Sequence, residues 1–334
     1  MRITSKILQK LANDFVSQQV RSDRGILAVY LYGSILKEPA VLGGTTDVDL
    51  FYIHSGEMKT GREIIRITDD VHMDIAHHPR EQYRQTHDLR LHPWLGPTIY
   101  HCEILYDPQH FMDFIQASVR GQFHTPENIL RRARVQVEHA RQIWFEFQFT
   151  TGASQPDELL KYLHAIELSA NSVAVLSGPP LTERRFLLHF VERARALNRP
   201  GLYPAVLGLL GGTSITPEAL QSWLPAWQAA FNALPPERTP ARLSPYRKPY
   251  YVRAFEAILE DNQPLAALWP LWFTWTRMIP LLPGESSHRE AWEAAGNALG
   301  LLGESFADRI AALDQYLDQV EETLEAWALD NGIS

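Results

Sequence analysis

Two aspartates stand two positions apart at the start of an apolar run, in Asp47-Val48-Asp49-Leu50. Residues two apart on a β-strand point to the same face, so the two carboxylates are expected to project together while Val48 and Leu50 pack the opposite face. Two carboxylates held side by side repel each other unless a positive charge lies between them. Magnesium suits carboxylates combined with substrate phosphates. The pair therefore predicts a magnesium site on this strand.

A third carboxylate follows in the segment 71–76. There Val71, Met73 and Ile75 alternate with His72, Asp74 and Ala76, which places Asp74 on the polar face of an otherwise apolar strand. A strand next to the Asp47/Asp49 strand would bring Asp74 to the same point. Three carboxylates can clamp two metal ions for in-line attack on a phosphoryl group. We therefore expect two Mg²⁺ ions bound by Asp47, Asp49 and Asp74.

Upstream of these acids, Gly33-Ser34 ends the apolar run 26–32. Glycine lets the backbone approach a ligand closely, and free amides at the start of a helix attract anions. Ser34 adds a hydroxyl donor. A strand that ends in Gly33-Ser34 before a helix is therefore expected to hold phosphate groups.

The order Gly33-Ser34, twelve further residues, Asp47-Val48-Asp49 and then Asp74 on a later strand resembles the DNA polymerase β-like nucleotidyltransferase superfamily. The resemblance covers about residues 25–106. It implies that Gly33 and Ser34 contact the triphosphate and that Asp47 and Asp49 bind magnesium. It also implies that Asp74 completes the metal site and assists deprotonation of the acceptor hydroxyl.

The helical second half makes the layout similar to the antibiotic nucleotidyltransferases of the kanamycin or aminoglycoside type. That likeness implies transfer of a nucleoside monophosphate from a triphosphate, with ATP the expected donor, to a hydroxyl of a small molecule, with release of pyrophosphate. An aminoglycoside-like antibiotic is one such acceptor. Two alternatives stay open: nucleotidylylation of a protein or tRNA, as in toxins and regulators, and a non-catalytic nucleotide-binding module.

The elements that must position these residues can be read from the apolar patterns. Continuous or alternating apolar runs predict strands, and Thr68-Asp69-Asp70 predicts a hairpin turn between two of them. The periodicity of residues 5–22 predicts an amphipathic helix. The expected strands span residues 26–32, 48–53, 62–67, 71–76 and 102–106.

The chain beyond residue 110 has helical spacing and no strong strand pattern. We therefore predict an α+β fold, with a small mixed sheet in a nucleotidyltransferase domain (residues 1–115) followed by an all-α bundle that binds the acceptor (residues 116–334). The expected helices span residues 126–150, 157–177, 182–198, 216–233, 245–262 and 302–330.

Composition limits the function further. The 334 residues include 39 acidic and 31 basic side chains, a formal net charge of −8, which argues against a protein that coats nucleic acid and favours a small or cationic acceptor. The single cysteine, Cys102, excludes an internal disulfide and fits a reducing cytosol, so a cytoplasmic protein is expected. The apolar segment 264–283 contains Arg277 and internal prolines, which indicates a buried, interrupted helix and no membrane partner.

Six histidines lie between residues 72 and 101, and their spacing matches no zinc site. We expect them to be ordinary polar residues, with His72 sharing a face with Asp74. The aromatic cluster 269–275 is expected to pack in a core.

Overall fold

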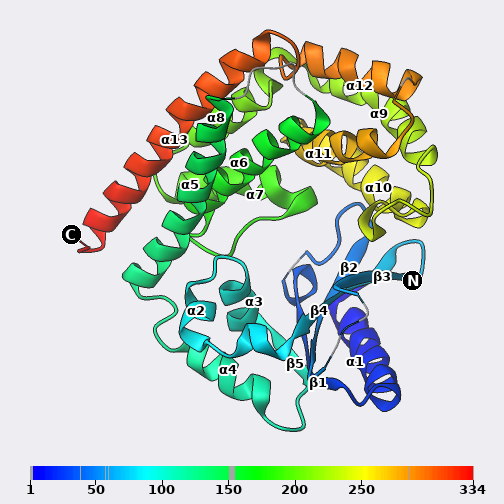
Figure 1. The fold of residues 1–334 in the computed structure, drawn as a ribbon, viewed down its shortest axis with the longest axis vertical. Coiled ribbons are helices and arrows are strands. Elements are labelled where there is room, and N and C mark those ends of the chain that lie inside the picture. Colours follow the sequence, from blue (N-terminus) through cyan, green and yellow to red (C-terminus); the bar gives the residue numbers. More distant parts are fainter. Residues whose placement is uncertain are drawn as a thin grey trace. The chain divides into compact units, whose positions relative to one another are not determined.

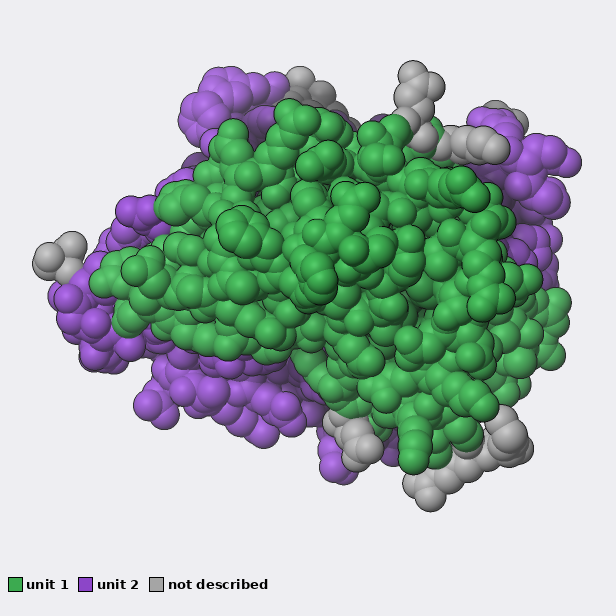
Figure 2. All heavy atoms as spheres, turned by 90° about the horizontal axis from the view of Figure 1, so that it is seen from below, with its two compact units in different colours: residues 1–128, 252–254 green, residues 129–251, 255–334 purple. Residues whose placement is uncertain are grey.

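The computed structural model describes residues 3–37, 39–56, 58, 60–149, 155–284 and 286–333. They divide into two compact units, unit 1 being Met1–Asn128 with Val252–Ala254 and unit 2 being Ile129–Tyr251 with Phe255–Ser334 (Figures 1 and 2). Unit 1 carries a small mixed sheet and unit 2 is helical, so the fold is α+β. The boundary expected after residue 115 falls inside helix α4 (Phe111–Arg120), whose buried face belongs to the core of unit 1.

The sheet of unit 1 has five strands in the order β3-β4-β2-β1-β5. The pair β2–β4 is parallel and the other pairs are antiparallel, which makes the sheet mixed. The five expected strands are all present, with small shifts at their ends. Their bounds are β1 Ile26–Tyr32, β2 Thr46–His54, β3 Arg62–Arg66, β4 Val71–Pro79 and β5 Glu103–Tyr106.

One face of the sheet is covered by helix α1 (Ser5–Ser22), which begins where the Thr4 side chain accepts a hydrogen bond from the Ile7 amide. Leu8, Ala12 and Val16, at helical spacing, are buried against apolar side chains of β1, β2 and β4. In β2 this core takes alternate residues: Val48, Leu50 and Tyr52. The intervening positions are thereby directed to the opposite face.

The opposite face packs against helices α2 (Thr86–Leu91), α3 (Leu95–His101) and α4 (Figure 1). The start of α4 is fixed by Asp107, whose two carboxylate oxygens accept hydrogen bonds from three backbone amides at 2.7–2.9 Å. Tyr30 of β1 and Ile53 of β2 belong to this second core. Apolar residues thus occupy one part of a face whose remaining positions carry the predicted acids.

The segment after β1 differs from expectation, because a regular helix does not follow Gly33. A single 3₁₀ turn, η1 (Ser34–Leu36), takes its place. Downstream, Gly43 and Gly44 adopt φ values of 57° and 74°, and Leu42 pairs with Thr45 in a tight turn just before β2. Proline and left-handed glycines suit turns, which explains why the spacer cannot hold a helix over this length.

Unit 2 contains no strand among its described residues and is built from helices around an aromatic core. Trp269, Trp272 and Trp275 of α11 are buried, as expected for the aromatic cluster. Arg141 of α5 forms ion pairs with three acidic side chains of α13. The helices are α5 Pro126–Phe147, α6 Pro156–Ala174, α7 Phe186–Ala196, α8 Leu202–Leu209, α9 Pro217–Asn232, α10 Lys248–Leu259, α11 Leu268–Met278, α12 Ser287–Ala298 and α13 Ser305–Asp330.

All six expected helical segments contain a helix, and α8 and α12 are additional. Residue 150, at the end of the first expected segment, lies outside the described residues. Within the part of the chain that the structure describes, no helix is both long enough and apolar enough to cross a membrane.

Candidate metal and nucleotide site

The parallel pair β2–β4 brings the three predicted acids to one face of the sheet. Asp49 is the register partner of Asp74, and Asp47 is the partner of His72. In-register residues of neighbouring strands project to the same side, so the carboxylates of Asp49 and Asp74 are neighbours. Asp47 is 7% exposed and Asp74 is 4% exposed, whereas Asp49 is half-buried. The register therefore brings three acidic side chains to one largely covered face of the sheet.

Gly33 lies directly against Asp49. Its φ of 101° and ψ of −158° belong to a region that L-residues with side chains rarely adopt. A Cβ atom added to Gly33 would lie 2.0 Å from Oδ2 of Asp49, closer than any real contact. Glycine is therefore required here for two independent reasons, the backbone conformation and the space that the carboxylate occupies.

Ser34 stands at the start of the 3₁₀ turn next to this carboxylate. Its hydroxyl oxygen lies 3.4 Å from that of Thr46, the first residue of β2. The Thr46 hydroxyl donates to the carbonyl oxygen of Ala40 at 3.0 Å, which ties the spacer to the strand. The predicted pair Gly33-Ser34 is thus brought to the end of β2 that carries Asp47 and Asp49.

One contact of the site is not evident from the sequence. Nε and Nη2 of Arg62, the first residue of β3, donate to Oδ1 and Oδ2 of Asp74, each at 2.6 Å. The Arg62 side chain is 41% exposed. It lies on the same face as Asp74, because Arg62 is paired with Ala76 in the antiparallel register. The hairpin predicted around residues 68–70 contained this information, since its register fixes which β3 side chains lie beside Asp74.

The donor chemistry fits a hard divalent cation, because carboxylate oxygens are what Mg²⁺ prefers. Among the described residues, however, no three His, Cys, Asp and Glu side chains are arranged as a metal site. Both oxygens of Asp74 instead accept hydrogen bonds from Arg62. A cation that used an oxygen of Asp74 would therefore have to compete with the guanidinium of Arg62.

The histidines of β4 are distributed over both faces. His72 is fully buried on the acidic face, with Nδ1 3.7 Å from Oδ1 of Asp47. His77 lies on the opposite face, where it bridges Nε2 of His54 at 2.8 Å and a carboxylate oxygen of Glu63 at 3.1 Å. Burial, reinforced by the neighbouring His77, lowers the pKa of His54. This second cluster is separated from the acids by the sheet itself.

His78 lies on the same face of the sheet as the three acids and takes part in a chain of hydrogen bonds. Nδ1 of His78 lies 2.7 Å from the Tyr83 hydroxyl, which lies 2.8 Å from the Tyr30 hydroxyl. Burial, with a smaller contribution from the charge of Arg62, lowers the pKa of His78 to about 4. His78 is therefore neutral at neutral pH and acts as a polar part of the core.

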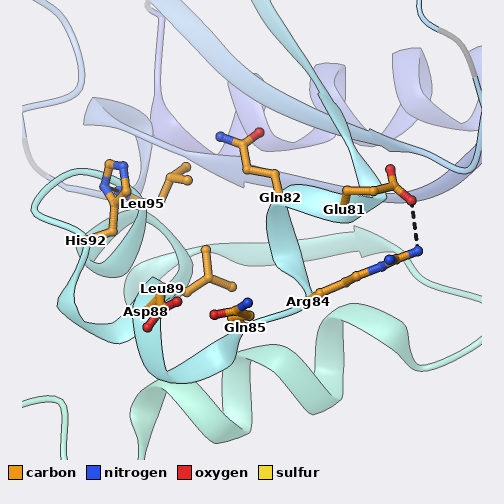
Figure 3. A pocket seen from close by; sticks show the side chains of 8 residues that line it. All are labelled: Glu81, Gln82, Arg84, Gln85, Asp88, Leu89, His92 and Leu95. Carbon is orange, nitrogen blue, oxygen red and sulfur yellow. Dashed lines mark hydrogen bonds and ion pairs between the residues drawn. The ribbon is translucent and has the colours of Figure 1, made fainter.

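A pocket of about 400 Å³ opens elsewhere in unit 1, and the five predicted residues are not among the eight that line it (Figure 3). Glu81 and Arg84 form an exposed ion pair at this pocket. Nδ1 of His92 accepts hydrogen bonds from two backbone amides at the start of α3, each at 3.1 Å, and burial lowers its pKa. The lining comprises Glu81, Gln82, Arg84, Gln85, Asp88, Leu89, His92 and Leu95.

Comparison with protein-family models gives no match for this chain, and comparison with curated proteins gives none either.

Proposed function

We propose that the protein is a magnesium-dependent nucleotidyltransferase that moves a nucleoside monophosphate from a nucleoside triphosphate, with ATP the expected donor, to a hydroxyl of a small-molecule acceptor. The observation that carries the proposal is that Gly33 lies against Asp49, which is in register with Asp74 on the neighbouring strand. Asp49 is in register with Asp74, and its carboxylate fills the space where a Gly33 side chain would be. The likeness to the polymerase β-like superfamily rests on the same residues.

In the proposed reaction, the acceptor hydroxyl oxygen attacks the α-phosphorus. A new O–P bond forms, the bond to the bridging oxygen of the β-phosphate breaks, and pyrophosphate leaves. Asp47 and Asp49, later joined by Asp74, would hold divalent cations, which neutralise charge on the phosphates. Ser34 would donate its hydroxyl to a phosphate oxygen. Gly33 leaves room for the carboxylate of Asp49 beside it. A carboxylate oxygen of Asp74 would take the proton of the acceptor hydroxyl.

A small cationic acceptor, such as an aminoglycoside-like antibiotic, is the preferred substrate because the formal net charge is −8. A protein hydroxyl or the end of a tRNA are the alternatives. Incubation of the full chain with Mg²⁺ and each α-labelled triphosphate, together with aminoglycosides, cell-extract protein or tRNA, separates them. The molecule that carries the label identifies the acceptor class.

The catalytic part of the proposal is tested by changing Asp47→Asn and Asp49→Asn. Each variant should lose turnover by about 10³-fold or more while it keeps its fold, because the cation ligands are removed and the packing is not. Asp14→Asn, an exposed change on α1 with the same loss of charge, is the control and should keep full activity. A non-catalytic nucleotide-binding module would show no label transfer at all, and triphosphate binding by calorimetry would then remain as its only activity.

A further inference from the structure

The carboxylate of Asp74 already forms an ion pair with the guanidinium of Arg62. The bidentate contact with Arg62 engages both carboxylate oxygens at 2.6 Å, the geometry of the strongest charge-assisted hydrogen bonds. Asp74 is 4% exposed, so little water competes for its oxygens. A cation or an acceptor hydroxyl that needs an oxygen of Asp74 has to compete with this guanidinium.

The charges explain why the two compete. While the ion pair lasts, the Arg62 guanidinium compensates the negative charge of Asp74. A divalent cation that approached Asp74 would be repelled by the guanidinium. With Arg62 withdrawn, the Asp74 carboxylate can bind a cation beside a triphosphate.

Resting on the proposed function, we propose that Arg62 is a displaceable counter-ion of the metal site. It neutralises Asp74 in the nucleotide-free protein and leaves this carboxylate when divalent cation and triphosphate bind. Arg62 is a positioning residue in this scheme, because it controls when Asp74 becomes available.

Arg62 is far more exposed than Asp74, so Arg62 is the partner that we expect to move. Asp74 lies on β4, between β3 and β2, and is buried. Arg62 begins the edge strand β3, and 41% of its side chain is exposed. A guanidinium at an edge can be rehydrated as it leaves, so its release costs less than exposing the buried carboxylate would.

Binding of Mn²⁺ alone, followed by the electron paramagnetic resonance signal of the free ion, tests the proposal without any assay of activity. Arg62→Gln should bind Mn²⁺ about tenfold more tightly than the wild type, because one positive charge is removed from the site. Arg66→Gln is the matched control. Arg66 lies on the same strand and face but pairs with the exposed Asp69, so its removal should leave the affinity unchanged.

A second variant covers the case in which Arg62→Gln does not fold, which circular dichroism would reveal. Arg62→Lys keeps the positive charge but cannot form the two parallel hydrogen bonds, so its Mn²⁺ affinity should lie between those of the wild type and Arg62→Gln. In the wild type, the ¹⁵Nε–¹Hε resonance of Arg62, assigned from its loss in Arg62→Lys, should shift when Mg²⁺ and a non-hydrolysable triphosphate are added together.

The outcomes distinguish this proposal from the proposed function. If an Mn²⁺ site that Asp49→Asn abolishes exists but neither Arg62 variant tightens it, Arg62 is not a counter-ion and the enzyme proposal stands. Weaker binding in both variants would likewise overturn the counter-ion role. If neither the wild type nor Arg62→Gln has an Asp49-dependent site, even with triphosphate, both proposals are overturned.

Discussion

The contact between Gly33 and Asp49 gives the sharpest stability prediction. Gly33→Ala forces a residue with a side chain to φ of 101° and places its Cβ 2.0 Å from Oδ2 of Asp49. The backbone conformation alone costs about 1–3 kcal/mol, and displacement of the carboxylate adds to it. We expect unit 1 to lose about 3 kcal/mol or more of unfolding free energy. Because a displacement near 1 Å at a reacting centre costs roughly 10²-fold, any nucleotidyl transfer should fall by about that factor.

Gly44→Ala is the matched control. Gly44 also has a positive φ, 74°, but a Cβ there would meet no heavy atom within 4 Å. It should therefore show only the left-handed backbone cost, about 1–2 kcal/mol. The difference between the two variants contains the contact with Asp49 and the less favourable backbone region of Gly33. A double-mutant cycle with Asp49→Ala, which removes the oxygen that the new Cβ would meet, should recover much of that difference.

The assay must report on unit 1 specifically. Trp94 is the only tryptophan of unit 1 among the nine in the chain, so intrinsic fluorescence follows mainly unit 2. Hydrogen–deuterium exchange of peptides that cover β1 and β2 measures the local free energy of opening directly. The reasoning would be refuted if Gly33→Ala cost no more than Gly44→Ala, or if its cost were the same with and without the Asp49 carboxylate.

Two further predictions concern the face of the sheet that packs against α2, α3 and α4. Burial lowers the pKa of His78 to about 4. Between that pH and about 6.5, the unfolded chain therefore binds a proton on this residue that the folded chain does not. The free energy of unfolding is thus unaffected by His78 above pH 6.5 and falls as the pH is lowered below it. His78→Gln should make the pH dependence of unfolding shallower by at most about 1.4 kcal/mol per pH unit over this range, and an unchanged slope would contradict the assignment. Asp107→Ala should lower the local stability of α4 by about 1–2 kcal/mol, because three amides lose their acceptor; unchanged exchange in α4 peptides would show that solvent replaces it.

The strands could be predicted because their signal is local. Alternation of apolar side chains placed Asp47 and Asp49 on one face of β2 and Asp74 on the polar face of β4, and the register of the two strands agrees with both assignments. Helix α1 followed from its periodicity in the same way. The roles of these residues stay predictions, since geometry alone does not establish chemistry.

What the sequence did not reveal depends on register or on the absence of periodicity. The ion pair between Arg62 and Asp74 exists only because β3 and β4 pair with a particular alignment. Helix α8 is apolar over most of its length, so its pattern has no period to detect. The helix expected after Ser34 does not form, because Gly43 and Gly44 adopt left-handed conformations that are typical of turns.

The order of the strands also bears on how the acidic site forms during folding. Strands β3 and β4 are neighbours in the sequence and can pair early as a hairpin, whereas the parallel ladder between β2 and β4 closes a loop that contains all of β3. Such non-local pairing is slow compared with a hairpin. We therefore expect the hairpin to place Arg62 beside Asp74 before Asp49 reaches them. The negative charge of Asp74 would then already be compensated when the parallel ladder closes.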